Sequence, residues 1–486
     1  MNIRALILTC VASATMSVRA DVCSQPAAAV SDHLIVASAP GHSGAQLAAL
    51  LQSITPGLAL EPIDGVPART IHLMRATWPQ GWTLVEVETW IDSTLASGVT
   101  PLAWMELDYL AQIPGGGTGS IFVDGILDDQ SAASQYAGGL LGLSTAHARA
   151  DGFGTVVAVV DTGADTQHPA LAGSIAPGGF DFVTGTTNVD DRADGSDSDG
   201  DGVPNELVGH GTFVSSLVRF AAQGARLLPI RVLDSDGNGR LWTVARGIFH
   251  AIDRGVEVIN VSIVSDYDSA AVEAAVDEAA TRGIVVVASA GNCASAERLY
   301  PAAKTGVLGV AATNHLDGKA SFSNFGGHID LAAPGASPVQ GPPLPATSVI
   351  GALPGGRWGA GSGTSFAAPL VSGVAALVRA QHPEWAPIET TNAAVADAVL
   401  ASCDDLATSD PVFGSQLGAG RLNAAAAVSA GPVQPRAGDF NGDGAVDGSD
   451  LALLLSQWGA VHSNADLNGD GVVSGEDLAY ILSSWS

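Results

Sequence analysis

The sequence has few basic residues and few charged residues altogether. Its 486 residues include 20 Lys and Arg against 49 Asp and Glu, which gives a formal net charge of −29. So acidic a chain lacks the basic face that nucleic-acid binding requires, and anionic membrane surfaces repel it. Charged residues make up only 14% of the chain and hydrophobic residues 47%. Disorder requires the opposite balance, so we predict a folded chain with one large domain and smaller ones.

Long apolar runs are missing after the N-terminus, so we expect no membrane span and no membrane partner. Residues 1–20 contain Arg4, an apolar stretch over 5–14, and Val18-Arg19-Ala20 before Asp21. This is the pattern of a secretory signal peptide that is cleaved after Ala20. We therefore expect a secreted protein, extracellular or associated with the cell surface, and a monomer.

Cysteine is scarce, and the histidines do not cluster. Of four cysteines, Cys10 lies in the predicted signal peptide and Cys23 precedes the main domain. Cys293 and Cys403 remain, and they can pair in an oxidising compartment if their Cα atoms are close. The 11 histidines show no clustered ligand signature, which excludes a zinc hydrolase.

The order of apolar runs and turns predicts the domain organisation. Residues 21–130 form a small mixed α+β unit that ends in the Gly-rich stretch 114–117. From 131 to 430, short continuous apolar runs alternate with helix-length segments. Strands that are apolar on both faces and separated by helices indicate an α/β fold with a parallel sheet covered by helices on both faces. A linker over 431–438 leads to a duplicated tail over 439–486, predicted to be all-α.

Three short motifs within the α/β region carry residues of catalytic chemistry. Asp161 follows the apolar run 156–160, His210 lies in Gly-His-Gly-Thr before an apolar helix, and Ser365 lies in Gly-Thr-Ser before another. Each motif alone has an ordinary structural explanation, as a turn, a buried His or a helix cap. Together, in the order Asp, His, Ser on a parallel α/β pattern, they match one of the known arrangements of the serine-protease triad.

The chain resembles the subtilisin-like serine proteases over residues 140–430. The strand 285–292 is similar to the one that ends in the family's oxyanion-hole Asn, here Asn292, and segments 320–326 and 330–335 are similar to its later signature. The resemblance implies a serine endopeptidase that cleaves protein or peptide substrates. Ser365 would be its nucleophile, His210 its general base, Asp161 the group that orients the His, and Asn292 an oxyanion donor.

Substrate binding is expected along two segments that resemble the family's peptide-binding strands, 233–239 and 259–263. In that family the substrate is added between them as an extra strand. The implied contact residues are Gly237, Gly239, Ser262 and Val264. Val264 departs from the pattern because a Gly is common there, and we expect its side chain to crowd the site for the residue before the scissile bond.

The resemblance also gives residues 21–130 the role of a propeptide, with 104–109 as its last strand. We predict a zymogen that cleaves itself between Gln112 and Gln135. The alternative is an unrelated N-terminal domain.

An acidic loop over 190–206 holds seven carboxylates and one Arg. Asp197, Asp199 and Asp201 alternate as calcium ligands do in loops, so one calcium ion is possible here. A solvated surface loop and an electrostatic attractor of basic substrates are the alternatives.

The tail repeats a calcium-loop pattern with a period of 27 residues. Oxygen-bearing residues occupy loop positions 1, 3, 5, 9 and 12, and position 7 offers a backbone carbonyl. The tail resembles the dockerin type I repeat, which implies two calcium ions and a cohesin-like or cell-surface partner. The predicted ligands are Asp439, Asn441, Asp443, Ala445, Asp447, Asp450, Asp466, Asn468, Asp470, Val472, Ser474 and Asp477.

Two other functions fit parts of the sequence. Asp161-Thr162-Gly163 is similar to the motif of retroviral-type aspartic proteases, which need a second catalytic Asp and leave the His and Ser motifs unused. A calcium-dependent binding protein with an inactive protease domain is the other alternative.

Overall fold

The structure is a computed structural model. It describes residues 28–115, 123–124, 127–198, 200, 202–338, 343–385, 388–429, 438, 440, 446–460, 465–468, 471–483 and 485. The predicted signal peptide, most of the linker and part of each calcium loop lie outside the described residues.

The N-terminal unit is an antiparallel sheet with two helices, in the order β2-β3-β1-β4. Gly44–Ile54 and Leu84–Ala96 are helical because apolar residues recur at helical spacing, and both begin with a capping box, at Ser43 and Thr83. Its elements are β1 (Ala29–Ser38), α1 (Gly44–Ile54), β2 (Ala59–Val66), β3 (Ile71–Thr77), α2 (Leu84–Ala96) and β4 (Leu102–Gln112).

The central domain contains a seven-stranded sheet in the order β13-β12-β11-β10-β6-β8-β7, in which every pairing is parallel. Alternate residues of β6 face different cores, since Ala158 and Val160 lie in one hydrophobic cluster and Val157 and Val159 in another. The predicted sheet, buried on both faces, is confirmed. Its strands are β6 (Val156–Asp161), β7 (Phe180–Asp181), β8 (Arg226–Arg231), β10 (Val258–Val261), β11 (Val285–Ser289), β12 (Val307–Thr313) and β13 (Leu331–Pro334).

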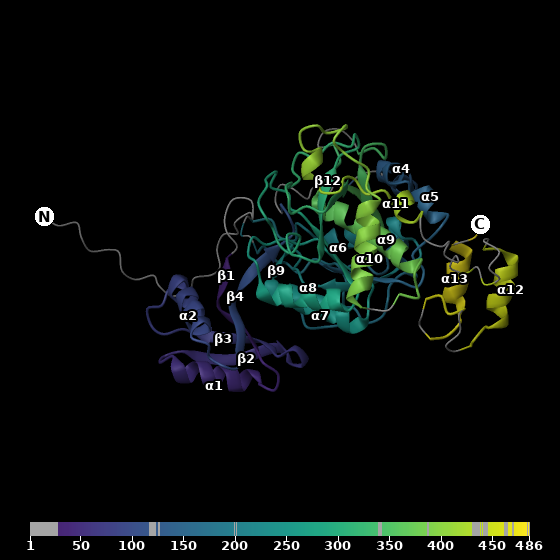
Figure 1. Ribbon diagram of the computed structural model, residues 1–486. Coiled ribbons are helices and arrows are strands. Elements are labelled where there is room, and N and C mark those ends of the chain that lie inside the picture. The colour runs from purple at the N-terminus through teal and green to yellow at the C-terminus, as the bar shows by residue number, and fades with distance from the viewer. Residues whose placement is uncertain are drawn as a thin grey trace.

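Helices cover both faces of this sheet (Figure 1). Helices α7 and α8 belong to the core that also contains the N-terminal unit, whereas α6, α9 and α10 form the opposite core. The longer helices are α6 (His210–Ala221), α7 (Leu241–Arg254), α8 (Ala270–Thr281), α9 (Thr364–Ala380) and α10 (Glu389–Ala401). Shorter elements are β5 (Val123–Asp124), α3 (Asp129–Ala133), α4 (Tyr136–Leu141), α5 (Leu143–His147), β9 (Asn238–Arg240), β14 (Val349–Leu353), β15 (Arg357–Gly361) and α11 (Ala424–Ala427).

The tail contributes α12 (Gly448–Ser456) and α13 (Gly475–Ser483), each of which begins within the last positions of one predicted calcium loop. Its small core packs against Phe153 of the central domain. Arg226 Nη1 also donates to the Asn468 carbonyl at 2.6 Å, so the tail is attached where β6 and β8 begin. The N-terminal unit and the tail contact different sides of the central domain (Figure 1).

The disulfide considered from the sequence does not form. Cys293 is disulfide-bonded, whereas Cys403 is a free thiol, so the two are not partners. Burial raises the pKa of the Cys403 thiol to about 12, which keeps the thiol protonated and unreactive. No helix of the described residues is long and apolar enough to cross a membrane.

Candidate active site

Asp161 and His210 meet at the carboxyl edge of the central sheet. Asp161 ends β6 and His210 begins α6, and His210 Nδ1 lies 2.8 Å from Asp161 Oδ1. Both side chains are fully buried. The backbone needs glycine at this junction, because a methyl group on Gly211 would lie 2.1 Å from the Gly163 carbonyl. The sequence therefore brings a carboxylate and an imidazole together by ending a strand and starting a helix at one point.

Ser365 lies in the first turn of α9, directly before Phe366. The neighbouring Phe366 ring has its centre 5.5 Å from that of His210. Within the described part of the chain, the buried Ser365 hydroxyl has no hydrogen-bond partner. Its backbone carbonyl accepts a hydrogen bond from Ser262 Oγ at 2.9 Å, which holds the turn in place.

Asn292 follows β11, and its side-chain amide lies against the first turn of α9, which carries Ser365. Its Oδ1 accepts hydrogen bonds from Thr364 N and Thr364 Oγ1, both at 2.9 Å. These bonds fix the amide so that Nδ2 faces outward, and Nδ2 donates to the Pro114 carbonyl at 2.8 Å. A carbonyl from the N-terminal unit therefore occupies the position in front of Asn292.

The end of β4 lies between the two segments predicted to bind substrate. It pairs with β9 on one side, where Ala111 opposes Gly239, and Ile113 N donates to the Gly237 carbonyl at 3.0 Å. On the other side Gln112 and Val264 exchange two backbone hydrogen bonds, of 3.0 and 2.8 Å. Three of the four predicted contact residues thus touch one strand, whereas Ser262 instead supports Ser365 through its hydroxyl.

Asp191 is a buried carboxylate beside this site that sequence analysis placed only in the acidic loop. One of its oxygens accepts from Gly209 N at 2.9 Å and Thr162 Oγ1 at 3.2 Å. The other accepts from Thr212 N at 3.0 Å and Thr212 Oγ1 at 2.8 Å. Burial, with a contribution from the charge of Asp161, raises the pKa of Asp191. The side chain ties the turn after Asp161 to the first turn of α6.

Two carboxylates of β4 lie at the N-termini of the helices that support the N-terminal unit. Glu106 accepts from Ser269 Oγ, Ala270 N and Ala271 N, at 2.8, 2.8 and 3.0 Å, where α8 begins. Asp108 accepts from Trp242 N at 3.0 Å, where α7 begins. Acceptors at these positions satisfy backbone donors that a helix cannot satisfy itself.

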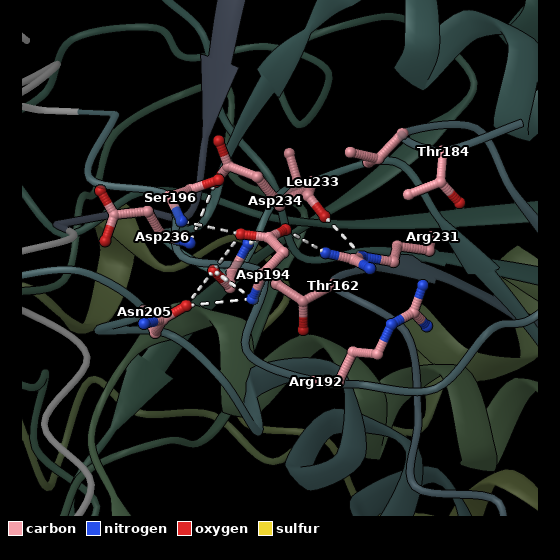
Figure 2. Close-up of polar contacts among 12 residues, drawn as sticks. Thr162, Thr184, Arg192, Asp194, Ser196, Asn205, Arg231, Leu233, Asp234 and Asp236 are labelled. Atoms are coloured by element: carbon pink, nitrogen blue, oxygen red, sulfur yellow. Dashed lines mark hydrogen bonds and ion pairs between the residues drawn. The ribbon is translucent and has the colours of Figure 1, made fainter.

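The acidic loop is organised around an arginine (Figure 2). Arg231, fully buried at the end of β8, donates to Asp194 Oδ2 at 2.5 Å and lies 3.4 Å from Asp181 Oδ2. Hydrogen bonds from Ser196 and Ser235, together with the charge of Arg231, outweigh burial and lower the pKa of Asp194 to about 2. Asp197 accepts from Gly200 N at 3.0 Å. Asp199 and Asp201 lie outside the described residues, so the predicted calcium site remains a prediction.

The tail loops repeat one hydrogen-bond arrangement. Asp450 and Asp477, both at loop position 12, are fully buried. Asp450 accepts from Phe440 N and Asp447 N, and Asp477 accepts from the equivalent Leu467 N and Ser474 N, at 2.7–3.0 Å. Buried carboxylates in an all-oxygen donor set suit calcium.

The predicted ligands of the tail divide between described and undescribed positions. Among the residues that the structure describes, no group of three or more His, Cys, Asp or Glu side chains is arranged to hold a metal ion. The predicted tail ligands outside those residues are Asp439, Asn441, Asp443, Ala445 and Asp470.

A parallel sheet with an Asp–His pair and a Ser at its carboxyl edge is the architecture of a serine hydrolase of the α/β class. Comparison with known sequences makes the assignment specific. The model of the subtilase family matches residues 152–420, and that of the dockerin type I domain matches residues 437–482. The chain belongs to the subtilase family, and it is a subtilisin-like serine protease with a dockerin module. Both predicted resemblances are confirmed.

Named relatives agree with this assignment. The chain is 35% identical over 242 residues to thermitase of Thermoactinomyces vulgaris, covering 48% of this chain and 77% of thermitase. It is 36% identical over 271 residues to subtilisin of Bacillus pumilus, covering 53% and 86%.

Solved structures show the same fold. A protease of Pseudoalteromonas arctica matches with a TM-score of 0.51 and 29% identity, over 60% of this chain and 94% of the other. Fervidolysin of Fervidobacterium pennivorans, a keratinolytic enzyme related to subtilisin, matches with a TM-score of 0.61 and 21% identity, over 84% and 62%.

Proposed function

We propose that this chain is a secreted serine endopeptidase, made as a zymogen, in which Asp161, His210 and Ser365 form the catalytic triad. The observations that carry the proposal are the buried 2.8 Å contact between His210 and Asp161 and a buried Ser365 hydroxyl that has no structural hydrogen bond within the described residues. A hydroxyl is a weak nucleophile at neutral pH, so it requires a neighbouring base.

His210 accepts the Ser365 proton as Oγ forms a bond to the substrate carbonyl carbon. The imidazolium is stabilised by Asp161 and then gives its proton to the leaving amine as the C–N bond breaks. Water hydrolyses the acyl-enzyme by the same steps. The oxyanion would be bound by Asn292 Nδ2 and the Ser365 N–H, and the N-terminus of α9 favours negative charge there.

The N-terminal unit would act as the propeptide. Its last strand is added between β9 and Val264 as a substrate would be, and its Pro114 carbonyl accepts from Asn292 Nδ2. We therefore place the first self-cleavage at the Pro114–Gly115 bond, within the predicted interval of Gln112 to Gln135. This moves the expected end of the propeptide from residue 130 to residue 114.

Expression of the full chain and of Ser365→Ala tests the proposal. We expect the unaltered chain to release a fragment whose C-terminal residue is Pro114 by intact mass, and to cleave casein with inhibition by phenylmethylsulfonyl fluoride but not by pepstatin. Ser365→Ala should remain uncleaved after purification. Cleavage of Ser365→Ala at the same bond would assign processing to another protease, and inhibition by pepstatin would favour the aspartic mechanism.

The tail would bind two calcium ions through the twelve loop ligands predicted above. Calcium neutralises the carboxylates gathered in each loop and links the loop to the helix that follows. We place the partner-binding surface on the exposed Leu455 and Trp458 and on their repeat equivalents, Leu482 and Trp485, which are about half exposed. A cohesin-like or cell-surface partner would then hold a secreted protease outside the cell.

A further inference from the structure

Pro114 precedes the proposed scissile bond and projects from one face of the bound strand. The protein side chains on that face therefore limit which residue fits before the scissile bond. Residues two apart in a strand project to the same face, so Pro114 and Gln112 share a face. Directly opposed residues of an antiparallel pair also share a face, so Val264, opposite Gln112, is on the Pro114 side. Val264 is therefore directed into the space that a substrate side chain before the scissile bond would need.

A second large side chain packs against Val264. Val264 and Leu299 are 0% and 1% exposed and pack together, with Cys293 against them. A methyl group on Gly291 would lie 2.5 Å from Leu299 Cδ1, so Leu299 covers the residue that precedes Asn292. Ser265 and Tyr300 exchange two backbone hydrogen bonds, of 2.9 and 2.8 Å, and hold the two segments together.

We propose that Val264 and Leu299 restrict the residue before the scissile bond to a small side chain, such as Ala, Ser or Pro. The proposal rests on the proposed function and on its cleavage at Pro114–Gly115. A compact proline ring suits a space that these two side chains have reduced. Proline has no N–H, but here the register of the strand is held by the N–H groups of Gln112 and Ile113.

The opposite face of the strand favours a branched aliphatic residue one position earlier. Ile113 is fully buried. A methyl group on Gly237 would lie 2.9 Å from Ile113 Cδ1 and 2.4 Å from Leu207 Cδ1, so both side chains pack over this glycine. Preferred substrates would thus carry an aliphatic residue followed by a small one, in the order of Ile113-Pro114.

The test uses the processed enzyme and peptides with the sequence Ala-Gln-Ile-X-Gly, in which X is Ala, Pro or Phe. We expect the unaltered enzyme to cleave the Ala and Pro peptides at least about 100-fold more efficiently than the Phe peptide, measured as kcat/KM. Val264→Gly combined with Leu299→Gly should raise the ratio of Phe to Ala cleavage by about 10- to 100-fold, because two side chains are removed from the site.

Leu207→Ala is the control variant, since it removes side-chain atoms on the other face of the strand. It should lower the preference for Ile over Ala at the preceding position and leave the Phe to Ala ratio at X within about twofold. If the glycine variant fails to fold, Val264→Ala with Leu299→Ala gives the same comparison. Equal cleavage of the Phe and Ala peptides by the unaltered enzyme, or an unchanged ratio in a folded variant, would overturn the specificity assignment. If the unaltered enzyme cleaves none of the three peptides, the result would instead contradict the proposed function.

Discussion

Asp190 and Asp191 are adjacent carboxylates whose substitution should have very different effects. Asp190 is exposed, whereas Asp191 is 4% exposed and accepts four hydrogen bonds from the segments that carry Asp161 and His210. We predict that Asp191→Asn lowers both stability and activity and that Asp190→Asn changes neither.

The expected loss of stability in Asp191→Asn follows from the four hydrogen bonds that Asp191 accepts. In Asp191→Asn, the amide oxygen can still accept hydrogen bonds from Gly209 N and Thr162 Oγ1. The NH₂ group, however, faces the Thr212 N–H and cannot accept a hydrogen bond from it. A buried backbone donor without an acceptor costs about 1–3 kcal/mol, and the loss of an anion at the N-terminus of α6 costs about 0.5–2 kcal/mol. Relief of a buried charge beside Asp161 offsets part of this, because burial raises the pKa of Asp191. A net loss of about 2–4 kcal/mol corresponds to a fall in Tm of roughly 3–6 °C for a domain of this size, whose entropy of unfolding is about 0.6 kcal/mol/K.

Thermal unfolding should be measured in the Ser365→Ala background, where self-digestion cannot occur. Activity is then compared in the active enzymes, and we expect kcat/KM of Asp191→Asn to fall by about tenfold or more because the His210 turn is displaced. Equal Tm and equal activity for the two variants would refute the role given to Asp191.

Three further predictions follow from other contacts. Asn292→Ala should lower kcat by about 10²–10³, a magnitude measured for this side chain in subtilisin itself; activity within twofold of normal in a peptide assay would exclude the oxyanion role. Burial, with the nearby charge of Asp108, raises the pKa of Glu106 to about 7. The pKa of Glu106 in the docked propeptide exceeds its ordinary value near 4.5, so protonated Glu106 favours docking. This contribution to the docking affinity is fully present below about pH 4.5. It is lost, by up to about 300-fold in affinity, as the pH rises through about 7. Release of the processed propeptide, followed as the onset of peptidase activity, should be faster at pH 8 than at pH 5, and Glu106→Gln should remove that difference; a release rate independent of pH in the unaltered chain would contradict it. EDTA should lower the helical circular dichroism of the tail, and Asp477→Asn should raise the calcium concentration needed to restore it; an isolated tail unaffected by EDTA would refute calcium binding.

Local sequence patterns were sufficient to predict the regular part of the fold. Helix α7, over 241–254, is one of the helix-length segments of the α/β region, and its amphipathic pattern ends at Gly255, which adopts a left-handed conformation. The strand before Asp161 and the helices at His210 and Ser365 were also predicted, since each of these three motifs borders an apolar run. Parallel α/β folds place such borders at one edge of the sheet.

Contacts between distant segments could not be predicted in the same way. Glu106 caps a helix whose N-cap residue, Ser269, lies 163 residues later, and nothing near Glu106 in the sequence indicates it. Asp194 is paired with Arg231, which lies on a strand outside the acidic loop. A dense carboxylate segment looks the same in sequence whether a cation or an arginine neutralises it, so only the structure distinguishes the two at Asp194.

The proposed cleavage site and the tail lie far enough apart for a substrate and a partner of the tail to be bound at the same time. Asp161 and His210 meet at the carboxyl end of β6, whereas the tail contacts Phe153 and Arg226 at the amino ends of β6 and β8. Six residues of strand separate these edges by about 20 Å. A partner bound to the outward-facing Trp458 and Trp485 would therefore leave the substrate-binding strands accessible, and the tail could hold the enzyme on a surface without competing with the peptide that it cleaves.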